Sequence, residues 1–155
     1  TLVSSRTATN TTQRGRGMKS RGRPRRGREK GKLPSIKSLR KKLDKLFSLW
    51  IRRRDADDNG FGACVSCGRF SLLQAGHYIK RQHVGELMLR WNPLNVAGQC
   101  GPCNAWGDAS VGGRFYCELV RRHGKPAIDE LEASKHTTLK LTRADYEELI
   151  RRFSA

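Results

Sequence analysis

The sequence has few large apolar side chains, few acids and no long hydrophobic run. Leu, Ile, Val and Phe together number 32 of 155 residues, about a fifth, which is close to the level at which chains stop folding unaided. No apolar run approaches the roughly 20 residues that a membrane-spanning helix needs. Leu2-Val3 before a polar stretch is not a secretory signal. The length also excludes a large multidomain enzyme, so we expect a soluble protein with a small core and no membrane partner.

The positive charge is concentrated at one end of the chain. The formal net charge is +18, and residues 1–33 alone hold eleven Lys and Arg against one acid. Residues 34–54 hold eight against one, and residues 55–155 hold thirteen against twelve. We predict a disordered Arg/Gly-rich basic arm over residues 1–33 and a folded domain over residues 34–155. The arm suits nucleic acid, because each neutralised phosphate releases counterions; the alternatives are a solubilising tail and a targeting segment.

The arm contains a possible DNA-binding motif. Residues 20–28 read Ser-Arg-Gly-Arg-Pro-Arg-Arg-Gly-Arg and include the Arg-Gly-Arg-Pro core of an AT-hook, an extended segment whose arginines enter the minor groove of A·T tracts. The candidate DNA contacts are Arg21, Arg23, Arg25 and Arg26. A general phosphate-binding tail is an equally good interpretation. The start also resembles a transit peptide, and Met18 is a candidate internal start.

An amphipathic helix is predicted from Pro34-Ser35 onward, with Ser35 as its N-cap. Its apolar residues recur every three or four positions, at Ile36, Leu39, Leu43, Leu46, Phe47 and Trp50. Its basic face and basic end supply further candidate phosphate contacts, namely Lys41, Lys42, Arg52 and Arg53, to which we add Arg90; a solvated face is the alternative. We also predict helices over residues 101–123 (interrupted near Gly112-Gly113) and 126–134, and a capping box at residues 142–145.

Four of the five cysteines form two Cys-x-x-Cys pairs, Cys64 with Cys67 and Cys100 with Cys103. A two-residue gap lets both thiolates of a pair reach one ion, and two pairs complete a tetrahedral zinc site. A disulfide framework is the alternative and suits a secreted chain. We predict one structural zinc ion, which would also stabilise a small core. Cys117 is expected to be a small buried hydrophobe.

The residues between the two cysteine pairs are typical of catalysis. Residues 74–79 read as a short strand that presents His77, residues 95–99 as a second strand with Asn95, and Asn104 begins a helix directly after the last cysteine. This layout resembles the HNH (ββα-metal) nuclease site, in which the zinc pairs hold hairpin and helix together. We therefore predict an α+β fold with a small zinc-stapled HNH core, flanking helices and a disordered basic N-terminal arm.

Residues 34–153 resemble the NinG (Rap) family of lambdoid phage recombination proteins. The similar stretches are Ile51–Asp55, Cys64–Gly68, Ala75–Tyr78, Leu89–Asn92, Asn95, Gln99–Asn104, Arg114, Glu118-Leu119, Gly124 and Ala127–Glu132. The resemblance implies a structure-specific, metal-dependent DNA endonuclease, a hydrolase that acts on branched double-stranded recombination intermediates such as Holliday junctions and D-loops. It also implies a phage- or prophage-encoded protein in the cytoplasm of the bacterial host.

The resemblance also implies roles for individual residues. His77 would be the general base that activates water, and Asn95 would tie the loop between the strands and orient the histidine. Asn104 stands where the last HNH residue binds the catalytic ion, and Asp108, one helical turn later, is a second candidate ligand for Mg²⁺ or Mn²⁺. His83 is a further candidate; its alternative is an exposed loop histidine.

Two other functions fit these residues. One is a non-catalytic, zinc-stabilised module that binds branched or A·T-rich DNA in recombination. The other is an RNA-binding zinc ribbon with an Arg/Gly tail, although Phe70, Tyr78, Trp91 and Trp106 form no evident stacking platform in the sequence. Symmetric cutting of a four-way junction would need two active sites, so a homodimer is a further expectation.

Overall fold

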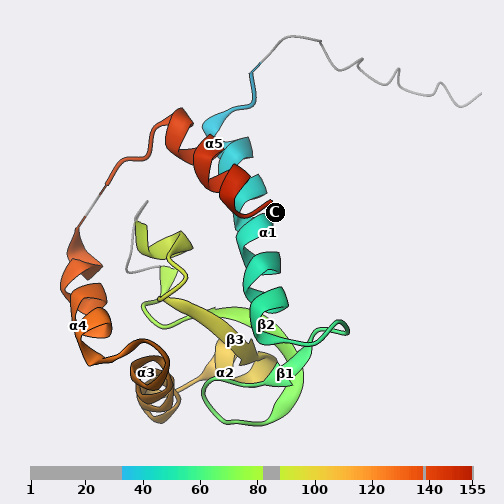
Figure 1. The fold of residues 1–155 in the computed structure, drawn as a ribbon, viewed down its shortest axis with the longest axis vertical. Coiled ribbons are helices and arrows are strands. Elements are labelled where there is room, and N and C mark those ends of the chain that lie inside the picture. The colour runs from blue at the N-terminus through green and yellow to red at the C-terminus, as the bar shows by residue number, and fades with distance from the viewer. Residues whose placement is uncertain (1–32, 82–87, 138, 155) are drawn as a thin grey trace, which may run out of the picture. The chain divides into compact units, whose positions relative to one another are not determined.

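The computed structural model describes residues 33–154 with the exception of residues 82–87 and 138 (Figure 1). The predicted basic arm, with its AT-hook-like segment, lies outside the described residues, as does His83. In chain order the elements are α1 Ile36–Asp55, β1 Phe61–Ala63, β2 Phe70–His77, the 3-10 helix η2 Met88–Trp91, β3 Val96–Cys100, α2 Gly101–Trp106, α3 Ala109–His123, α4 Lys125–Ala133, the 3-10 helix η3 Ser134–His136 and α5 Arg143–Arg152.

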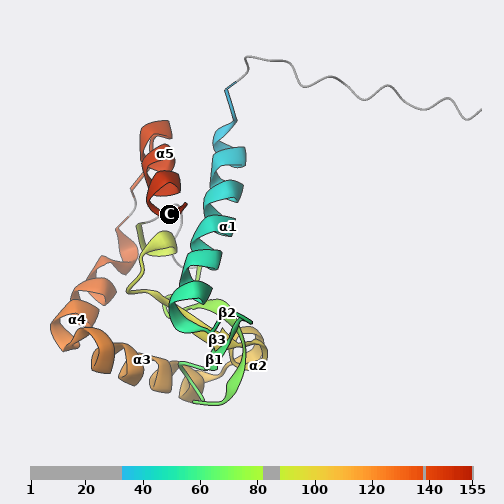
Figure 2. The same cartoon turned by 45° about the vertical axis from the view of Figure 1, so that its right-hand side comes forward.

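The predicted amphipathic helix is confirmed as α1. Ser35 caps it, since its Oγ accepts a hydrogen bond from Ser38 N at 3.2 Å. The apolar stripe of α1 packs against α5, which runs beside it in Figures 1 and 2. The predicted capping box at the start of α5 is present, with Thr142 and Asp145 bonded to each other's backbone.

The three strands form one antiparallel sheet in the order β1-β2-β3. The register between β2 and β3 pairs Leu73 with Cys100 and His77 with Val96. The cysteine and the histidine therefore lie at opposite ends of the β2-β3 ladder, about 13 Å apart along the strands. The sheet thus has a cysteine end and a histidine end.

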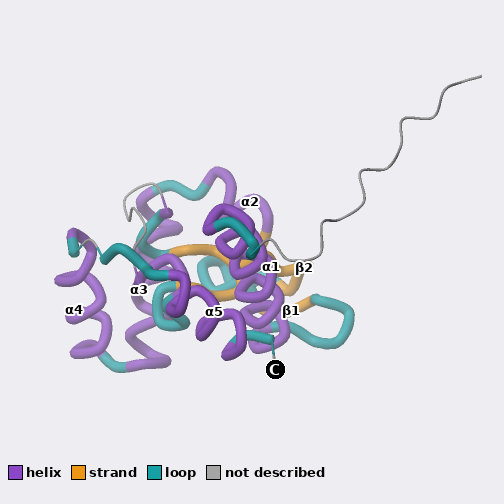
Figure 3. The backbone as a smooth tube through the Cα atoms, turned by 90° about the horizontal axis from the view of Figure 1, so that it is seen from above, coloured by secondary structure: helices purple, strands orange, loops and turns teal. Residues whose placement is uncertain are grey.

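Strand β3 is buried on both faces, because it contributes to two separate cores. Val96 and Ala97 are consecutive and fully buried, and successive side chains of a strand point to opposite faces. Val96 joins the core of α1 and α5, which also holds Leu39, Leu43, Phe47, Ile51, Trp91, Tyr146, Ile150 and Phe153. Ala97 joins the core of α3 and α4, which also holds Val65, Leu89, Phe115, Leu119, Ile128 and Leu131. Figure 3 shows α3 and α4 to one side of α1 and α5.

The prediction of one helix over residues 101–123 with a break near Gly112-Gly113 is wrong. The chain leaves the helix at Gly107, and α3 then runs through both of the later glycines. Asp108 explains the break, because its Oδ1 accepts a hydrogen bond from Val111 N at 3.0 Å and so caps a new helix. The predicted helix at residues 126–134 is confirmed as α4. Within the part of the chain that the structure describes, no helix combines the length and apolar character needed to cross a membrane.

Candidate functional site

The four paired cysteines converge at one end of the sheet. Their sulfur atoms all lie within 4.8 Å of one another. Cys64 and Cys67 flank a tight turn that follows β1, in which Gly68 has a φ of +70° and donates its N–H to the Cys64 carbonyl at 2.8 Å. Cys100 ends β3 and caps α2, and Cys103 lies in the first turn of that helix. Two local turns from distant parts of the chain therefore supply two sulfur atoms each.

The cysteine group could bind a metal ion such as zinc. The Sγ atoms of Cys67 and Cys100 are 3.8 Å apart, close to the roughly 3.8 Å edge of a tetrahedron with 2.3 Å zinc–sulfur bonds. All five cysteines are free thiols in the structure, which does not support the alternative of a disulfide framework. Cys117 is exposed, and the prediction that it is buried is wrong, because its side of α3 faces solvent and not the α3–α4 core.

Cys64, Cys100 and Cys103 differ in how readily their thiols ionise. Burial opposes ionisation of Cys64, but hydrogen bonds from the backbone of Cys100, Cys67 and Ser66 outweigh it and lower its pKa to about 7. Burial and the neighbouring thiols raise the pKa of Cys103 to about 12, and burial also raises the pKa of Cys100. Cys64 therefore ionises most readily of these three, and a cation would be needed to stabilise thiolates at Cys100 and Cys103.

His77 lies at the opposite end of the sheet with a defined orientation. Its Nε2 is 2.9 Å from the carbonyl oxygen of Arg90. A carbonyl only accepts hydrogen bonds, so Nε2 carries the proton and Nδ1 is left as the basic nitrogen. Burial, together with the charges of Arg81 and Arg90, lowers the pKa of His77 to about 4. The imidazole is therefore neutral at physiological pH, the state that a general base requires.

Asn95 holds the loop on which His77 depends. The side chain is fully buried just before β3. Its Oδ1 accepts from Ile79 N at 2.8 Å, and its Nδ2 donates to the carbonyls of Ile79 at 3.1 Å and Leu89 at 2.9 Å. These bonds join the end of β2 to η2. This is the kind of contact that the predicted loop-tying role requires.

Asp44 of α1 holds the same turn from the other side, and no sequence pattern pointed to it. Its carboxylate accepts from Arg90 Nε at 2.9 Å, from Arg90 Nη2 at 2.8 Å and from Trp91 Nε1 at 3.0 Å. Burial opposes ionisation of Asp44, but the contacts with Arg90 and Trp91 outweigh it and lower its pKa. The Arg90 side chain is only 13% exposed. This placement favours a structural role for Arg90 over the predicted phosphate contact.

A surface pocket of about 730 Å³ brings together four of the predicted site residues, namely His77, Cys103, Asn104 and Asp108. Asn104 Nδ2 donates to Gln74 Oε1 at 2.8 Å, and this bond does not use its Oδ1. Asp108 uses Oδ1 to cap α3 and to accept from Ser110 Oγ. The pocket is also lined by Lys80 and Arg81. These two exposed cations were missed in the sequence, because they follow the strand in a segment with no periodic pattern.

The residue before His77 is a glycine, Gly76, because the neighbouring strand leaves no space for a side chain there. A Cβ atom built on Gly76 would lie 2.3 Å from Gln99 Oε1 of the neighbouring strand. Gln99 is itself buried and donates from Nε2 to Ser66 Oγ at 2.8 Å. A side chain at position 76 would therefore displace the buried Gln99 side chain, which explains the glycine before His77.

The remaining predicted contacts are divided between α1 and the arm. Lys41, Lys42, Arg52 and Arg53 are exposed on α1, as the helical pattern predicts. Arg21, Arg23, Arg25 and Arg26 lie outside the described residues.

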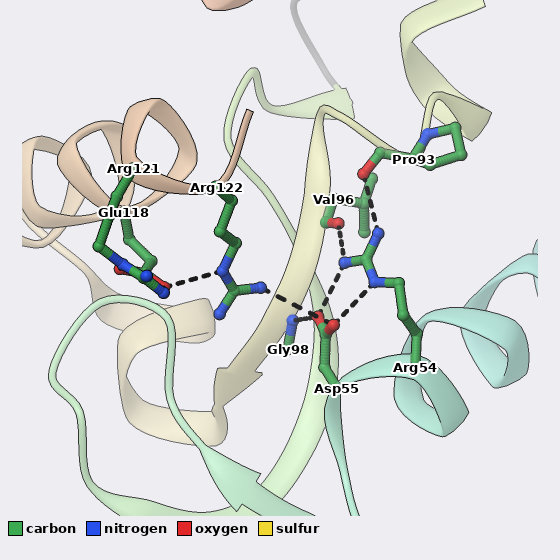
Figure 4. A network of polar contacts seen from close by, with 8 residues as sticks. All are labelled: Arg54, Asp55, Pro93, Val96, Gly98, Glu118, Arg121 and Arg122. Carbon is green, nitrogen blue, oxygen red and sulfur yellow. Dashed lines mark hydrogen bonds and ion pairs between the residues drawn. The ribbon is translucent and has the colours of Figure 1, made fainter. Parts of the chain in front are cut away.

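A polar network ties the sheet to both helical layers (Figure 4). Asp55, at the end of α1, accepts two hydrogen bonds from Arg54 and one from Gly98 N of β3 at 2.6 Å. Arg122 of α3 lies 3.7 Å from the same carboxylate and also pairs with Glu118. Arg54 donates in addition to the Val96 carbonyl at 2.8 Å. Burial opposes ionisation of Asp55, but these partners outweigh it and lower its pKa.

Comparison with known proteins shows that this sequence is similar to one family of phage proteins. A family model described as "Bacteriophage Lambda NinG protein" matches residues 2–155. Protein ninG of Escherichia phage lambda is 29% identical over 119 residues, or 72% of this chain and 55% of that protein. Protein ninG of Escherichia phage 933W is 32% identical over 96 residues, which cover 61% of this chain and 44% of that protein. Protein ninG of Salmonella phage P22 is 29% identical over 119 residues, which cover 72% of this chain and 55% of that protein. The chain spans about half the length of the curated relatives it matches. No solved structure matches it significantly.

Proposed function

Because this chain belongs to the NinG family of bacteriophage proteins, we propose that it is a metal-dependent endonuclease that hydrolyses phosphodiester bonds in branched recombination intermediates of DNA. Holliday junctions and D-loops are the substrates that fit this proposal. The observation that carries it is the pocket in which an oriented, neutral His77 shares one surface with Asn104, Asp108 and two exposed cations.

His77 is the proposed general base. The bond to the Arg90 carbonyl occupies Nε2, so Nδ1 takes the proton from the attacking water. Asn95 and Asp44 fix the turn that carries this carbonyl, and they act as positioning residues. Lys80 and Arg81 are placed to hold the phosphates that flank the scissile bond.

A divalent ion would be held at Asn104 and Asp108. Mg²⁺ is commonly bound through one or two carboxylates, with waters and substrate phosphates completing its shell, so a sparse protein ligand set suits it. The hydrogen bonds described for these residues leave Asn104 Oδ1 and Asp108 Oδ2 as the ligand atoms. When bound, the ion would neutralise charge on the phosphate and the leaving 3′ oxygen.

Zinc at the four cysteines would have a separate, structural role. It would join the turn after β1 to the start of α2. Because Asn104 directly follows Cys103, the zinc site would also fix the wall of the pocket that carries the proposed ion ligands. A closed four-sulfur shell leaves no position for a substrate water.

A second candidate function is a non-catalytic, zinc-stabilised module that binds branched DNA. One observation favours it: within the described ranges, the cysteines are the only group of three or more His, Cys, Asp or Glu side chains placed to share a metal ion. A chain that binds junctions tightly and cuts none of them would match this reading.

The deciding experiment is a cleavage and binding assay of His77→Ala. Purified protein is incubated with branched, duplex and single-stranded DNA, with and without Mg²⁺ or Mn²⁺. We expect metal-dependent cleavage of branched DNA by the natural sequence, loss of cleavage in His77→Ala, and nearly unchanged binding. His136→Ala is the matched control, since His136 is exposed on η3 and does not line the pocket. Cleavage by His77→Ala at the unaltered rate would refute the assignment.

A further inference from the structure

Trp106 is exposed to solvent, which is unusual for a tryptophan in a small folded domain. Its side chain is 81% exposed, more than any other large apolar side chain in the described part of the chain. The other two tryptophans belong to the core of α1 and α5, where Trp91 is 3% exposed and Trp50 contacts the rings of Phe47 and Phe153. An indole has one of the largest apolar surfaces of any side chain. Packing among the described residues therefore gives no reason for a tryptophan at position 106.

The position of Trp106 relates it to the pocket. It is the last residue of α2, and its two neighbours, Ala105 and Gly107, both line the pocket that holds His77. The chain packs closely directly after it, because a Cβ atom built on Gly107 would lie 2.4 Å from the Cys103 carbonyl oxygen. The indole is therefore carried by the end of a helix, next to the rim of the pocket.

The charges around the pocket suit an anionic partner. Lys80 and Arg81, both exposed, line it together with residues of the junction between α2 and α3. Asp108 is the one acid among the lining residues, and it serves as the cap of α3. Trp106 itself does not line the pocket, but it adjoins the part of the rim formed by Ala105 and Gly107. An exposed flat ring next to a pocket that is lined by two cations is suited to a nucleotide outside a duplex, with the base on the ring and the phosphates on the cations.

We propose that Trp106 stacks on a base face that is exposed at the branch point of a DNA junction. Within a duplex every base is already stacked on its neighbours, whereas a branch point leaves base faces available. Stacking on Trp106 sets which phosphate lies opposite His77, so this residue contributes selectivity for branched over plain duplex DNA. This inference rests on the proposed function, because it takes the phosphate in the pocket to be the one that is cleaved.

The test uses the full chain with His77→Ala, so that binding is measured without cleavage. Trp106→Ala and Trp106→Phe are compared on a four-way junction and on a duplex of the same sequence. The junction carries 2-aminopurine either at the branch point or within one arm. Phe70→Ala is the matched control, because the Phe70 ring is 66% exposed on the β1-β2 hairpin and does not line the pocket. Sedimentation of the free proteins is recorded in parallel.

We expect Trp106→Ala to bind the junction about tenfold more weakly, in line with the loss of one base–aromatic stack, and to bind duplex as before. Trp106→Phe should keep most of the affinity. The junction should quench tryptophan emission and change 2-aminopurine emission at the branch point, and both signals should disappear in Trp106→Ala. Phe70→Ala should behave as the parent.

Three results would overturn the inference. The first is junction affinity and branch-point fluorescence that do not change in Trp106→Ala. The second is equal loss on duplex and junction. The third is a change of oligomeric state that accounts for the loss, which would assign Trp106 to a protein contact. Failure of the proposed function is recognised separately: the unsubstituted chain then binds junctions without cutting them, and the Trp106 variants still decide the stacking question.

Discussion

At the level of single residues, the chemistry of the candidate site depends on one backbone carbonyl. The Arg90 carbonyl selects which nitrogen of His77 carries the proton, and so which nitrogen can act as a base. That carbonyl is held through Asp44, 46 residues away from Arg90 in the sequence. A shift of this turn would move the proposed base, His77, away from the water that it is proposed to activate. A shift of about 1 Å is enough to lower a catalytic rate strongly.

Asp44→Asn is therefore expected to lower kcat about tenfold or more while junction affinity changes little. The amide keeps the size of the side chain but loses the charge that holds Arg90. Single-turnover cleavage and binding under non-cleaving conditions separate the two quantities. Asp58→Asn, an exposed acid in the turn after α1, is the control. Equal loss of binding and cleavage would indicate a general structural defect and contradict a positioning role.

His77 should also make stability depend on pH. Its pKa is 6.5 in an unfolded chain and about 4 in the fold. Between these values the unfolded chain takes up a proton that the folded chain does not, so the free energy of unfolding falls as the pH falls from 6.5 to 4. The full effect is about 3 kcal/mol. His77→Gln removes the titration, and its urea unfolding curves should show a flatter pH dependence in this window.

Other groups also respond to pH, so the comparison between the two proteins is what matters. The pKa of His123 is lowered as well, by burial and by the charges of Arg54 and Arg122. Zinc bound at the cysteine site would also be lost as the thiols take up protons. These contributions are shared by both proteins and cancel in the difference. Parallel pH profiles for the two proteins would mean that His77 is not kept neutral by the fold.

At the level of elements, the two cysteine turns join parts that have little else to hold them. β1 has three residues, and α2 has six and no buried side chain. Neither is long enough to be stable by itself. A shared ion would cross-link both to the end of β3. The metal should therefore be a condition for the structure around the pocket and not an addition to it.

Cys100→Ser is accordingly expected to lose zinc and the fixed structure of the hairpin and α2. Zinc binding by four cysteines contributes roughly 10–16 kcal/mol of apparent folding free energy, which exceeds the stability of an ordinary small domain. Metal analysis should give about one zinc per chain before the substitution, with loss of dispersed amide signals after it. Cys117→Ser, at an exposed cysteine, is the control. A fully folded metal-free chain would sink this expectation.

The elements were partly predictable because some of their causes are local. The stripe of α1 and the caps Ser35 and Thr142 are set by residues within one or two turns, and these were predicted from the sequence. Asp108 was read as a metal ligand, and its capping of α3 was missed, because the same carboxylate can do either. β1 has only three residues and forms by pairing with β2, so it left no pattern of its own.

The candidate site was predictable to the same extent. The four cysteines are predicted from their spacing in two pairs. His77, Asn95 and Asn104 are predicted from their order along the chain relative to those pairs. The link between Asp44 and Arg90 depends on how α1 crosses the sheet, which no local pattern contains. For that reason Arg90 was read as a phosphate contact, although its guanidinium is bound within the fold.

At the level of the whole molecule, one buried carboxylate joins α1, β3 and α3. The Asp55 side chain is 9% exposed. It accepts hydrogen bonds from Arg54 and Gly98 and forms an ion pair with Arg122. Asp55→Asn should lower the free energy of unfolding by about 2–3 kcal/mol, because hydrogen bonds to a charged group are lost and the cations remain. Urea unfolding measures this. Asp129→Asn, in an exposed pair with Lys125, should have little effect; equal effects of the two would contradict a joining role for Asp55.

The charge of the whole chain leads to the last prediction. Residues 1–33 carry eleven Lys and Arg against one acid, whereas residues 55–155 are close to neutral. Each phosphate that the arm neutralises adds about 0.9 to the slope of log affinity against log salt on duplex DNA. Deletion of residues 1–33 should therefore weaken DNA binding at low salt and flatten that slope by several units. Preference for junctions should remain, since the proposed branch contacts lie in the folded part.

A single substitution separates the two interpretations of the arm. If the Arg-Gly-Arg-Pro segment acts as an AT-hook, Arg23→Ala reduces the preference for A·T-rich duplex, because an arginine that enters the minor groove reads its width and potential. If the arm is a charged tail, the substitution removes about one phosphate contact on any sequence. We expect the second result, because a match of four residues in an Arg/Gly-rich segment arises readily from composition alone. A salt slope that does not change after the deletion would assign the arm to targeting instead of DNA binding.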